Sequence, residues 1–211
     1  VITGSSSGFG EDAAKVFSDA GYRVWATMRD TTERNAAVKK ALESHSSKIS
    51  VVEMDVKDDN SVKDAFCDIF KEIDEVDVLI NNAGIMYTGI TEGFSIAQAH
   101  EQMNTNYYGA IRTTQAVLPN MRKAGNGLII NVSSIAGRIA VPYFGTYCAT
   151  KFALEAYSQS LRYELAPCGI DIALVEPGPF STGLFGAIKQ PERAEVVNSY
   201  GELKNIPDAL F

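Results

Sequence analysis

The stretch VITGSSSGFGEDAAKVF, residues 1–17, decides the fold class. Its first three residues are typical of the end of a buried strand, and the apolar spacing that follows predicts a helix over 9–20. Gly4, Gly8 and Gly10 join the two elements. Glycines let the backbone approach a ligand closely, and the free N–H groups of a helix N-terminus attract an anion. The stretch therefore predicts a turn that binds the phosphates of a nucleotide.

The remainder of the chain alternates between buried strands and amphipathic helices. Runs rich in Val and Ile predict five further strands, at 23–28, 49–54, 76–81, 127–132 and 170–175. Apolar residues spaced by three and four predict helices at 32–44, 60–73, 96–123 and 147–166. The alternation predicts an α/β doubly wound Rossmann fold, a parallel sheet of six or seven strands with helices on both faces. We expect one domain over 1–211, in which 182–211 covers the substrate and both termini are incomplete.

Composition narrows the classes of function. The 211 residues are 45% hydrophobic and 21% charged, with a net charge of -7. A surface that binds nucleic acid needs an excess of lysine and arginine, so nucleic acid is not an expected partner. The three cysteines, Cys67, Cys148 and Cys168, are widely separated, which predicts reduced thiols in a cytoplasmic protein rather than disulfides or a metal site. No uninterrupted apolar run reaches the about 18 residues that a membrane span needs.

A second stretch, SSIAGRIAVPYFGTYCATK at 133–151, contains candidate catalytic groups. Tyr147 and Lys151 are four residues apart, so they share one face of a helix. Ser134 directly follows a predicted strand and lies thirteen residues before Tyr147. In a doubly wound sheet, ligands bind beyond the carboxyl ends of the strands, so we expect these three side chains to converge there. Ser133 is the alternative to Ser134, and the thirteen-residue spacing favours Ser134.

A matching pair near the end of the chain has no such context. Tyr200 and Lys204 are also four residues apart. The residue thirteen positions before Tyr200 is Ala187, and no strand is predicted ahead of it. The spacing of a tyrosine and a lysine is therefore not enough by itself, and only the first pair is expected at the site.

The groups at the first pair fit the transfer of a hydride to or from a carbonyl carbon. The carbonyl oxygen must gain or lose a proton, which Tyr147 can donate or accept. Lowering the pKa of a phenol from about 10 to about 7 takes roughly 4 kcal/mol, and a cation about 4 Å away at an effective dielectric constant of about 20 supplies a similar amount. We expect Lys151 to be that cation and to hold the nicotinamide ribose hydroxyls. Ser134 is expected to donate a hydrogen bond to the substrate oxygen.

The motif T-G-x-x-x-G-x-G at 3–10, NNAG at 81–84 and the set of Ser134, Tyr147 and Lys151 resemble the short-chain dehydrogenase/reductase family. The segments VWATMRD and SLRYELAPCGI resemble its hydroxysteroid and retinol dehydrogenase branch. The resemblance implies a Rossmann-fold oxidoreductase that acts on CH-OH groups with NAD(P). It implies a cofactor site made of Gly4, Ser5, Ser7, Gly8, Phe9, Gly10, Asp55, Val56, Asn82, Ala83, Gly84, Tyr147, Lys151, Pro177, Gly178, Phe180 and Thr182.

The same resemblance implies a fourth catalytic residue and an assembly. Asn106 aligns with the family's asparagine in N-x-x-G, where a kinked helical turn lets its backbone bind a water that contacts the lysine. Asn104 has the same side chain, but the position before Gly109 favours Asn106. Helices 96–123 and 147–166 are implied to pair across a two-fold axis, in a homodimer or homotetramer.

The residue after the second strand bears on the choice of cofactor. Arg29 directly follows the position at which NAD-binding relatives carry an acid, and its planar guanidinium fits a 2′-phosphate. Asp30 is the alternative, because it lies about 20 residues after the glycines, where an acid would bind the ribose of NAD. We expect NADP(H) rather than NAD(H), with Ser5 and Ser7 as further hydroxyl donors.

Apolar residues are expected around the substrate, which favours a small lipophilic ketone or alcohol. The predicted wall consists of Met86, Ile135, Val141, Pro142, Tyr143, Phe180, Leu184 and Phe185. A non-catalytic regulator that senses the dinucleotide is an alternative, as is an isomerase with a tightly held cofactor. A regulator could dispense with Ser134, Tyr147 or Lys151, so the presence of all three favours an enzyme.

Overall fold

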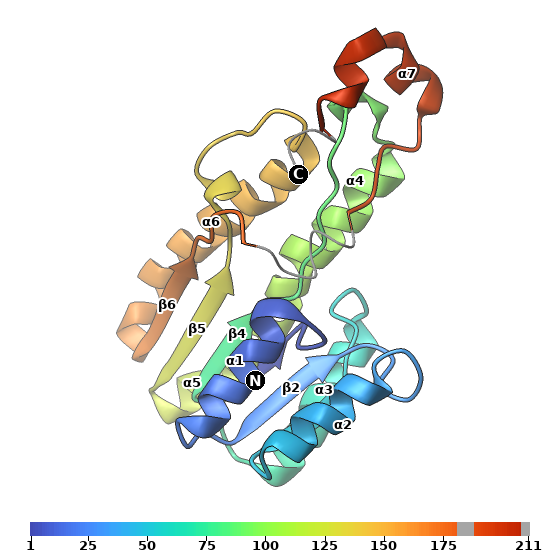
Figure 1. Ribbon diagram of the computed structural model, residues 1–211. Helices are drawn as coiled ribbons and strands as arrows, with labels where there is room; N and C mark the ends of the chain where they lie inside the picture. The colour runs from blue at the N-terminus through green and yellow to red at the C-terminus, as the bar shows by residue number, and fades with distance from the viewer. Residues whose placement is uncertain (181–187, 208–211) are drawn as a thin grey trace.

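The computed structural model describes residues 1–180 and 188–207, which include six parallel strands in one sheet (Figure 1). The strands are β1 (Ile2–Thr3), β2 (Val24–Met28), β3 (Ile49–Glu53), β4 (Val78–Asn81), β5 (Gly127–Val132) and β6 (Ile170–Val175). Their order is β3-β2-β1-β4-β5-β6, and every neighbouring pair is parallel. The chain changes direction across the sheet between β1 and β4, where a doubly wound sheet opens a crevice for a ligand. The predicted fold class is confirmed.

Helices cover both faces of this sheet. The helices that pack on the sheet are α1 (Gly8–Asp19), α2 (Ala36–His45), α3 (Asp59–Glu72), α5 (Gly109–Ala124) and α6 (Gly145–Leu165). Two further helices, α4 (Ile96–Met103) and α7 (Ala194–Ser199), lie beyond its carboxyl edge, toward the top of Figure 1. Ala14 of α1 and Leu42 of α2 belong to one apolar core. Ile69 of α3, Val117 of α5 and Leu165 of α6 belong to a second core, which contains other residues of the same strands. The two layers leave the carboxyl ends of the strands free for loops.

The helix predicted over 96–123 is interrupted by a π-helical turn at Asn104–Tyr108. α5 begins directly after it at Gly109, where a Cβ atom would lie 2.9 Å from Cγ2 of Val56. A glycine is therefore needed for this close packing. A π-helical turn contains one extra residue and often occurs at functional sites. The kink implied for this helix has the form of a π-helical turn, and Asn106 is buried within it.

α2 begins later than predicted, at Ala36. Asp30 has a left-handed backbone, with φ of 51°, and its carboxylate accepts hydrogen bonds from the backbone N–H groups of Glu33 at 3.1 Å and Arg34 at 3.2 Å. Aspartate side chains that bond to nearby N–H groups compete with helix formation. The residues that were predicted to open the helix therefore form a turn.

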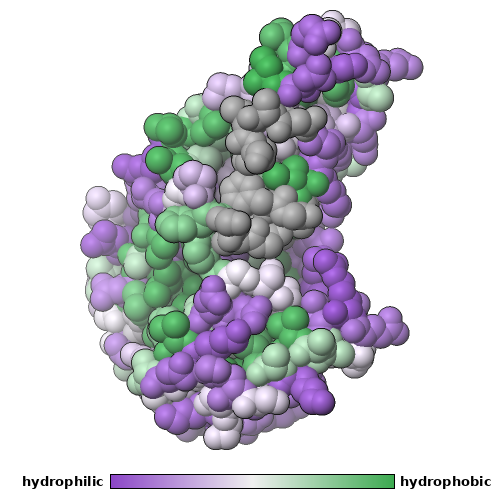
Figure 2. All heavy atoms as spheres, in the orientation of Figure 1, coloured by the Kyte–Doolittle hydropathy of each residue, from purple (hydrophilic) through white to green (hydrophobic). Residues whose placement is uncertain are grey.

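Residues 188–207 form an extension beyond the carboxyl edge of the sheet, at the top of Figure 1. Lys189 makes a parallel bridge with Tyr87, and its ammonium lies 3.2 Å from a carboxylate oxygen of Glu101. These contacts hold the extension against the loop between β4 and α4. Figure 2 shows hydrophilic side chains on the outer side of this extension. The covering role of 182–211 stays a prediction, because part of that segment lies outside the described residues.

Candidate active site

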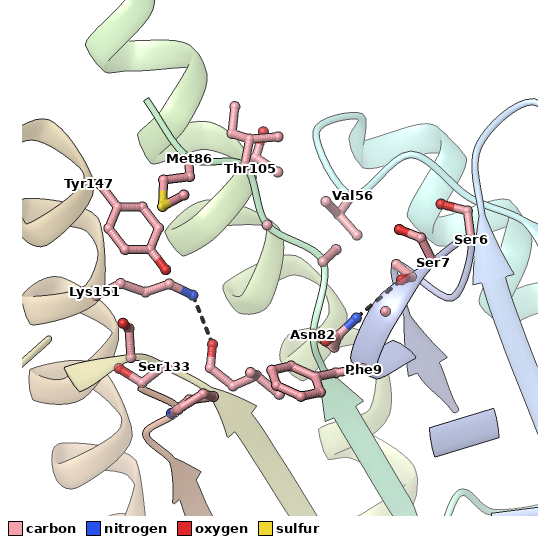
Figure 3. A pocket seen from close by; sticks show the side chains of 18 of the residues that line it. Ser6, Ser7, Phe9, Val56, Asn82, Met86, Thr105, Ser133, Tyr147 and Lys151 are labelled. Atoms are coloured by element: carbon pink, nitrogen blue, oxygen red, sulfur yellow. Dashed lines mark hydrogen bonds between the residues drawn. The ribbon is translucent and has the colours of Figure 1, made fainter. Parts of the chain in front are cut away.

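A cavity of about 610 Å³ lies at the carboxyl edge of the sheet, between the glycine turn and the amino end of α6 (Figure 3). Its volume is in the range of ligand-binding pockets, about 300–1,000 Å³. Most of the predicted site residues line it: Gly4, Ser7, Gly8, Phe9, Arg29, Asp55, Val56, Asn82, Ala83, Gly84, Ser134, Tyr147, Lys151, Pro177, Gly178 and Phe180. Ser5, Gly10 and Asn106 do not line it, and Thr182 lies outside the described residues. The structure therefore brings the glycine turn to the same cavity as Ser134, Tyr147 and Lys151.

The glycine turn has the geometry of a cradle for an anion. Gly4 and Gly8 have positive φ values of 68° and 55°, which glycine adopts without strain. A Cβ atom on Gly4 would lie 2.7 Å from Cα of Ala83, so glycine also permits the approach of the neighbouring loop. Ser7 is the N-cap of α1, and its side chain makes no capping hydrogen bond. The N–H groups of the first turn of α1 are thus free to bind a phosphate.

Two expectations for this turn need correction. Ser5 was expected to add a hydroxyl donor, but its side chain is fully buried and donates to the carbonyl oxygen of Ile2 at 3.0 Å. Ser6 lines the cavity in its place. Gly10 is buried, and a Cβ atom there would lie 2.3 Å from the carbonyl oxygen of Gly4. Gly10 therefore permits α1 to pack against the turn rather than contacting a ligand.

Asn82 ties the glycine turn to β4 at the point where the strand order reverses. Its side-chain amide donates to the carbonyl oxygens of Thr3 at 2.9 Å and Gly4 at 3.1 Å. The backbone N–H groups of Asn82 and Ala83 in turn donate to the hydroxyl of Thr3, at 3.0 and 2.9 Å. These four bonds cross from β4 to β1 and fix the floor of the cavity.

A buried polar network lies beneath the NNAG motif. Asn81 of β4 and Asn131 of β5 are paired in register, and the amide of Asn81 donates to the side-chain oxygen of Asn131 at 2.8 Å. Asn81 also bonds to Thr113 and Thr114 of α5, and the amide of Asn131 donates to Ser158 of α6 at 2.8 Å. Satisfied buried networks of this kind rigidify a core. Asn81 therefore joins the sheet to α5 and α6 and does not line the cavity.

The end of the cavity near β2 and β3 carries several charges. Arg29 and Asp55 both line it, with Nη1 of Arg29 3.9 Å from Oδ2 of Asp55. Asp30 lines it too, but one of its carboxylate oxygens is used by the turn before α2. That turn also brings Arg34 to the lining of the cavity. No sequence pattern indicates Arg34, because the turn that places it depends on the left-handed backbone of Asp30.

Ser134, Tyr147 and Lys151 converge at the opposite end. Tyr147 and Lys151 are 6% and 5% exposed, and Figure 3 shows both side chains pointing into the cavity. The ammonium of Lys151 donates to the carbonyl oxygen of Val132 at 2.8 Å and lies 5.8 Å from the centre of the Tyr147 ring. Ser134 is the N-cap of a short 3₁₀ turn, and its hydroxyl accepts a hydrogen bond from the N–H of Ala136 at 3.1 Å.

The protein surroundings raise the pKa of Tyr147 rather than lowering it, which corrects the expectation drawn from its spacing with Lys151. Burial raises the pKa of the phenol, and a hydrogen bond with Ser134 opposes this effect. Burial also lowers the pKa of Lys151 to about 8, while the negative charge of Glu155 raises it. The Lys151 ammonium is drawn to the Val132 carbonyl, so its charge does not make the phenol acidic in the protein alone.

Asn106 is held by three hydrogen bonds of its side chain. Its oxygen accepts from the N–H of Ile85 at 2.8 Å, and its amide donates to the carbonyl oxygen of Ile85 at 2.9 Å and to Thr150 at 3.0 Å. Asn106 thereby joins the loop after β4 to α6. Asn104 instead accepts a hydrogen bond from Arg112 at 2.8 Å. The water-binding role of the Asn106 backbone stays a prediction.

Apolar residues also line the cavity. Four predicted wall residues line it: Met86, Ile135, Val141 and Phe180. Pro142 and Tyr143 do not, whereas Phe144, which was not predicted, does. Tyr143 has a φ of 69°, and its carbonyl oxygen accepts a hydrogen bond from Gly89, so this loop turns away from the direction expected. Leu184 and Phe185 lie outside the described residues.

The chain is similar to known proteins. The family model described as short chain dehydrogenase matches residues 1–193. The chain belongs to the short-chain dehydrogenase family. It is 42% identical over 183 residues to the 3-ketodihydrosphingosine reductase of Bacteroides thetaiotaomicron, across 87% of this chain and 64% of that protein. It is 40% identical over 191 residues to retinol dehydrogenase 8 of Bos taurus, across 89% of this chain and 61% of that protein. The chain thus spans less than two thirds of the length of these curated relatives.

Solved structures of the family superpose on the chain. A short-chain dehydrogenase from Streptomyces avermitilis has a TM-score of 0.88 and 34% identity, over 99% of this chain and 75% of that one. A gluconate 5-dehydrogenase from Burkholderia cenocepacia, in complex with NADP and tartrate, has a TM-score of 0.80 and 29% identity, over 87% and 71%. A short-chain dehydrogenase/reductase from Burkholderia phymatum, in complex with NAD, has a TM-score of 0.82 and 25% identity, over 88% of this chain and 67% of that one. A nicotinamide cofactor is therefore supported, and both kinds occur in the family.

A helix that crosses a lipid bilayer needs about 20 predominantly apolar residues. Within residues 1–180 and 188–207, no helix has both the length and the hydropathy of a membrane-crossing helix.

Proposed function

We propose that this protein is an NADP(H)-dependent oxidoreductase that transfers a hydride between nicotinamide and a carbonyl compound or secondary alcohol. The observation that carries the proposal is that Ser134, Tyr147 and Lys151 line the same cavity as the glycine turn. One cavity therefore contains groups that suit nucleotide phosphates and groups that suit proton transfer at a carbonyl oxygen. A cofactor and a substrate bound there together would be in contact with both sets of groups. Membership of the short-chain dehydrogenase family supports the same reaction class.

The residues of the cavity fit a dinucleotide. The cradle at Gly4 exists only without a side chain, because a Cβ atom there would lie 2.7 Å from Ala83. The first turn of α1 offers free N–H groups to the phosphates, and Phe9 and Val56 provide apolar surface beside it. When bound, nicotinamide would supply or accept the hydride, which no protein side chain can do.

Tyr147 is the proton donor when a ketone is reduced. Its raised pKa keeps the phenol protonated at neutral pH, which is the form that an acid needs. Ser134, hydrogen-bonded to the phenol, can hold the substrate oxygen beside it. Lys151, with a pKa of about 8, is charged at neutral pH and supplies the positive charge near the phenolate that forms. Asn106 is proposed to continue the proton path to solvent through its backbone.

The charges near β2 favour NADP(H) over NAD(H). Arg29 and Arg34 both line the cavity. Guanidinium groups form strong, often bidentate hydrogen bonds with phosphates. The carboxylate of Asp30, the candidate ligand for the ribose of NAD, already accepts two hydrogen bonds from the turn before α2. The 2′-phosphate of NADP therefore suits this end better than a free ribose hydroxyl.

The substrate proposed is a lipophilic ketone or alcohol. The cavity wall near Tyr147 includes Met86, Ile135, Val141 and Phe144. Two similar proteins are named for 3-ketodihydrosphingosine and for retinol, which are both lipophilic. The covering of this substrate by 182–211 is part of the same proposal.

The setting of the protein is proposed from its surface and its thiols. The three cysteines are free, with Cys67 exposed, which fits the reducing cytoplasm. α6 exposes Phe152 and Tyr163, at 43% and 83%, which fits pairing of α5 and α6 across a two-fold axis in a homodimer or homotetramer. The chain is proposed to act as one catalytic domain.

A panel of ketones with NADPH or NADH, and of alcohols with NADP⁺ or NAD⁺, tests the proposal through the absorbance of the reduced nicotinamide. We expect reduction of lipophilic ketones, with kcat/KM for NADPH above that for NADH by about tenfold or more, the worth of one or two charged hydrogen bonds. NADPH binding without turnover across the panel would indicate a dinucleotide sensor. Preference for NADH would indicate an NAD-dependent enzyme, and either result contradicts the proposal.

A further inference from the structure

α6 carries a third buried polar group on the face that holds Tyr147 and Lys151. Glu155 follows Lys151 by four residues, as Lys151 follows Tyr147, so the three side chains lie along one side of the helix. Glu155 is 4% exposed. Tyr147 and Lys151 line the cavity, and Glu155 does not. A carboxylate is therefore buried one helical turn behind the ammonium.

This carboxylate lacks the hydrogen bonds that usually accompany burial. Among the residues that the structure describes, neither oxygen of Glu155 has a hydrogen-bond partner, and neither does Oγ of Ser133. Gly137 closes over the group, since a Cβ atom there would lie 2.7 Å from Oγ of Ser133, 3.1 Å from Cγ of Glu155 and 3.2 Å from Cβ of Lys151. Burying a carboxylate in this way destabilises a fold, and an apolar residue would avoid that cost. The charge is therefore explained by its neighbours rather than by packing.

Two positive groups face the carboxylate. On its own helix, Glu155 interacts electrostatically with Lys151 and raises the pKa of that ammonium, which burial alone lowers. From the segment after the 3₁₀ turn Ile135–Gly137, Nη1 of Arg138 lies 3.6 Å from Oε2 of Glu155. The segment after β5 contributes Ser133, which is uncharged. The Arg138 side chain is 54% exposed, so it is solvated, whereas Lys151 is not.

We propose that Glu155 is a positioning residue that acts through Lys151: its buried carboxylate is the counter-charge of the buried ammonium, and Arg138 is its outer partner. The inference rests on the proposed function, because it assigns Lys151 a charge that the reaction uses. Without Glu155, Lys151 would lose its proton at lower pH and would no longer hold ribose hydroxyls or face a phenolate as a cation at neutral pH. Glu155 itself touches neither cofactor nor substrate.

The variants Glu155→Gln and Glu155→Asp test the proposal in two profiles, NADPH affinity by nucleotide fluorescence and kcat/KM for ketone reduction, each from pH 6 to pH 10. We expect the alkaline limb of both profiles to move to lower pH by about one unit or more in Glu155→Gln, since a neighbouring opposite charge shifts a pKa by about 1–3 units. Glu155→Asp keeps a carboxylate, so its alkaline limb should lie much closer to that of the wild type than the limb of Glu155→Gln does. A Glu155→Gln profile that superposes on that of the wild type would overturn the proposal.

Arg138→Gln provides a test that does not disturb the buried side chains. Without this cation, the carboxylate of Glu155 interacts with Lys151 alone. The alkaline limb of both profiles should therefore move to higher pH, opposite to the shift in Glu155→Gln. The shift should be roughly a few tenths of a pH unit, because Arg138 is largely exposed. A shift to lower pH, or none, would overturn the proposal even if Glu155→Gln fails to fold. Wild-type protein that binds NADPH but reduces no ketone would contradict the proposed function, and the NADPH-affinity profile would still test Glu155.

Discussion

The buried ammonium of Lys151 should cost folding stability at neutral pH, and Lys151→Met should reveal that cost. Burial lowers the pKa of Lys151 from 10.5 to about 8, with Glu155 acting in the opposite direction. The unfolded chain therefore binds more protons than the folded protein between about pH 8 and pH 10.5. The penalty is full below pH 8 and shrinks as the pH rises toward 10.5. The difference, 10.5 - 8 = 2.5 units, corresponds to about 3 kcal/mol at about 1.36 kcal/mol per unit.

Urea unfolding followed by circular dichroism, at several pH values from 7 to 10, measures this effect. We predict that the free energy of unfolding of Lys151→Met, minus that of the wild type, falls by about 2.5 kcal/mol over this range. Lys204→Met is the matched control, because Lys204 also follows a tyrosine by four residues but is exposed. Its difference from the wild type should stay nearly constant with pH. A constant difference for Lys151→Met as well would refute the reasoning, since the ammonium would then not be desolvated.

Two further substitutions test the cofactor end of the cavity. Arg29→Asp should lower the ratio of kcat/KM for NADPH to that for NADH by about tenfold or more. The reason is that it removes the proposed ligand of the 2′-phosphate and adds a charge that repels this phosphate. An unchanged ratio would mean that the 2′-phosphate is bound elsewhere. Gly10→Ala should reduce the free energy of unfolding by about 1–3 kcal/mol and weaken NADPH binding, because its Cβ would lie 2.3 Å from the carbonyl oxygen of Gly4. Gly178→Ala is the stability control, because a Cβ there meets no atom of residues 1–180 and 188–207 within 4 Å, and equal losses in both would contradict the packing argument.

The fold was predictable because its determinants are local. Val- and Ile-rich runs mark each strand, and the order of strand and helix fixes a parallel sheet. The start of α2 was not predictable, since it depends on the left-handed backbone of Asp30 and on two hydrogen bonds of its carboxylate. The same turn brings Arg34 to the lining of the cavity, so its place there could not be predicted either.

Spacing predicted which candidate catalytic side chains meet, but not their electrostatics. Tyr147 and Lys151 share a helical face, as their four-residue separation requires. The ammonium of Lys151, however, bonds to the carbonyl oxygen of Val132, nineteen residues earlier in the chain. Burial of Tyr147 and Lys151 depends on the whole fold, and it moves the two pKa values in directions that no local pattern indicates. The Ser5 hydroxyl faces away from the cavity because it donates to the carbonyl oxygen of Ile2, three residues earlier in the chain.

The most direct test of the catalytic assignment compares Tyr147→Phe with Tyr200→Phe, the matching change in the exposed pair. Tyr200 is hydrogen-bonded to Glu92 at 2.7 Å and is absent from the cavity wall. Single-turnover reduction of a ketone and NADPH binding are measured on both variants. We predict that Tyr147→Phe binds NADPH with near wild-type affinity and loses turnover by about 10²-fold or more, while Tyr200→Phe keeps both. Turnover retained in Tyr147→Phe would contradict its role as the proton donor.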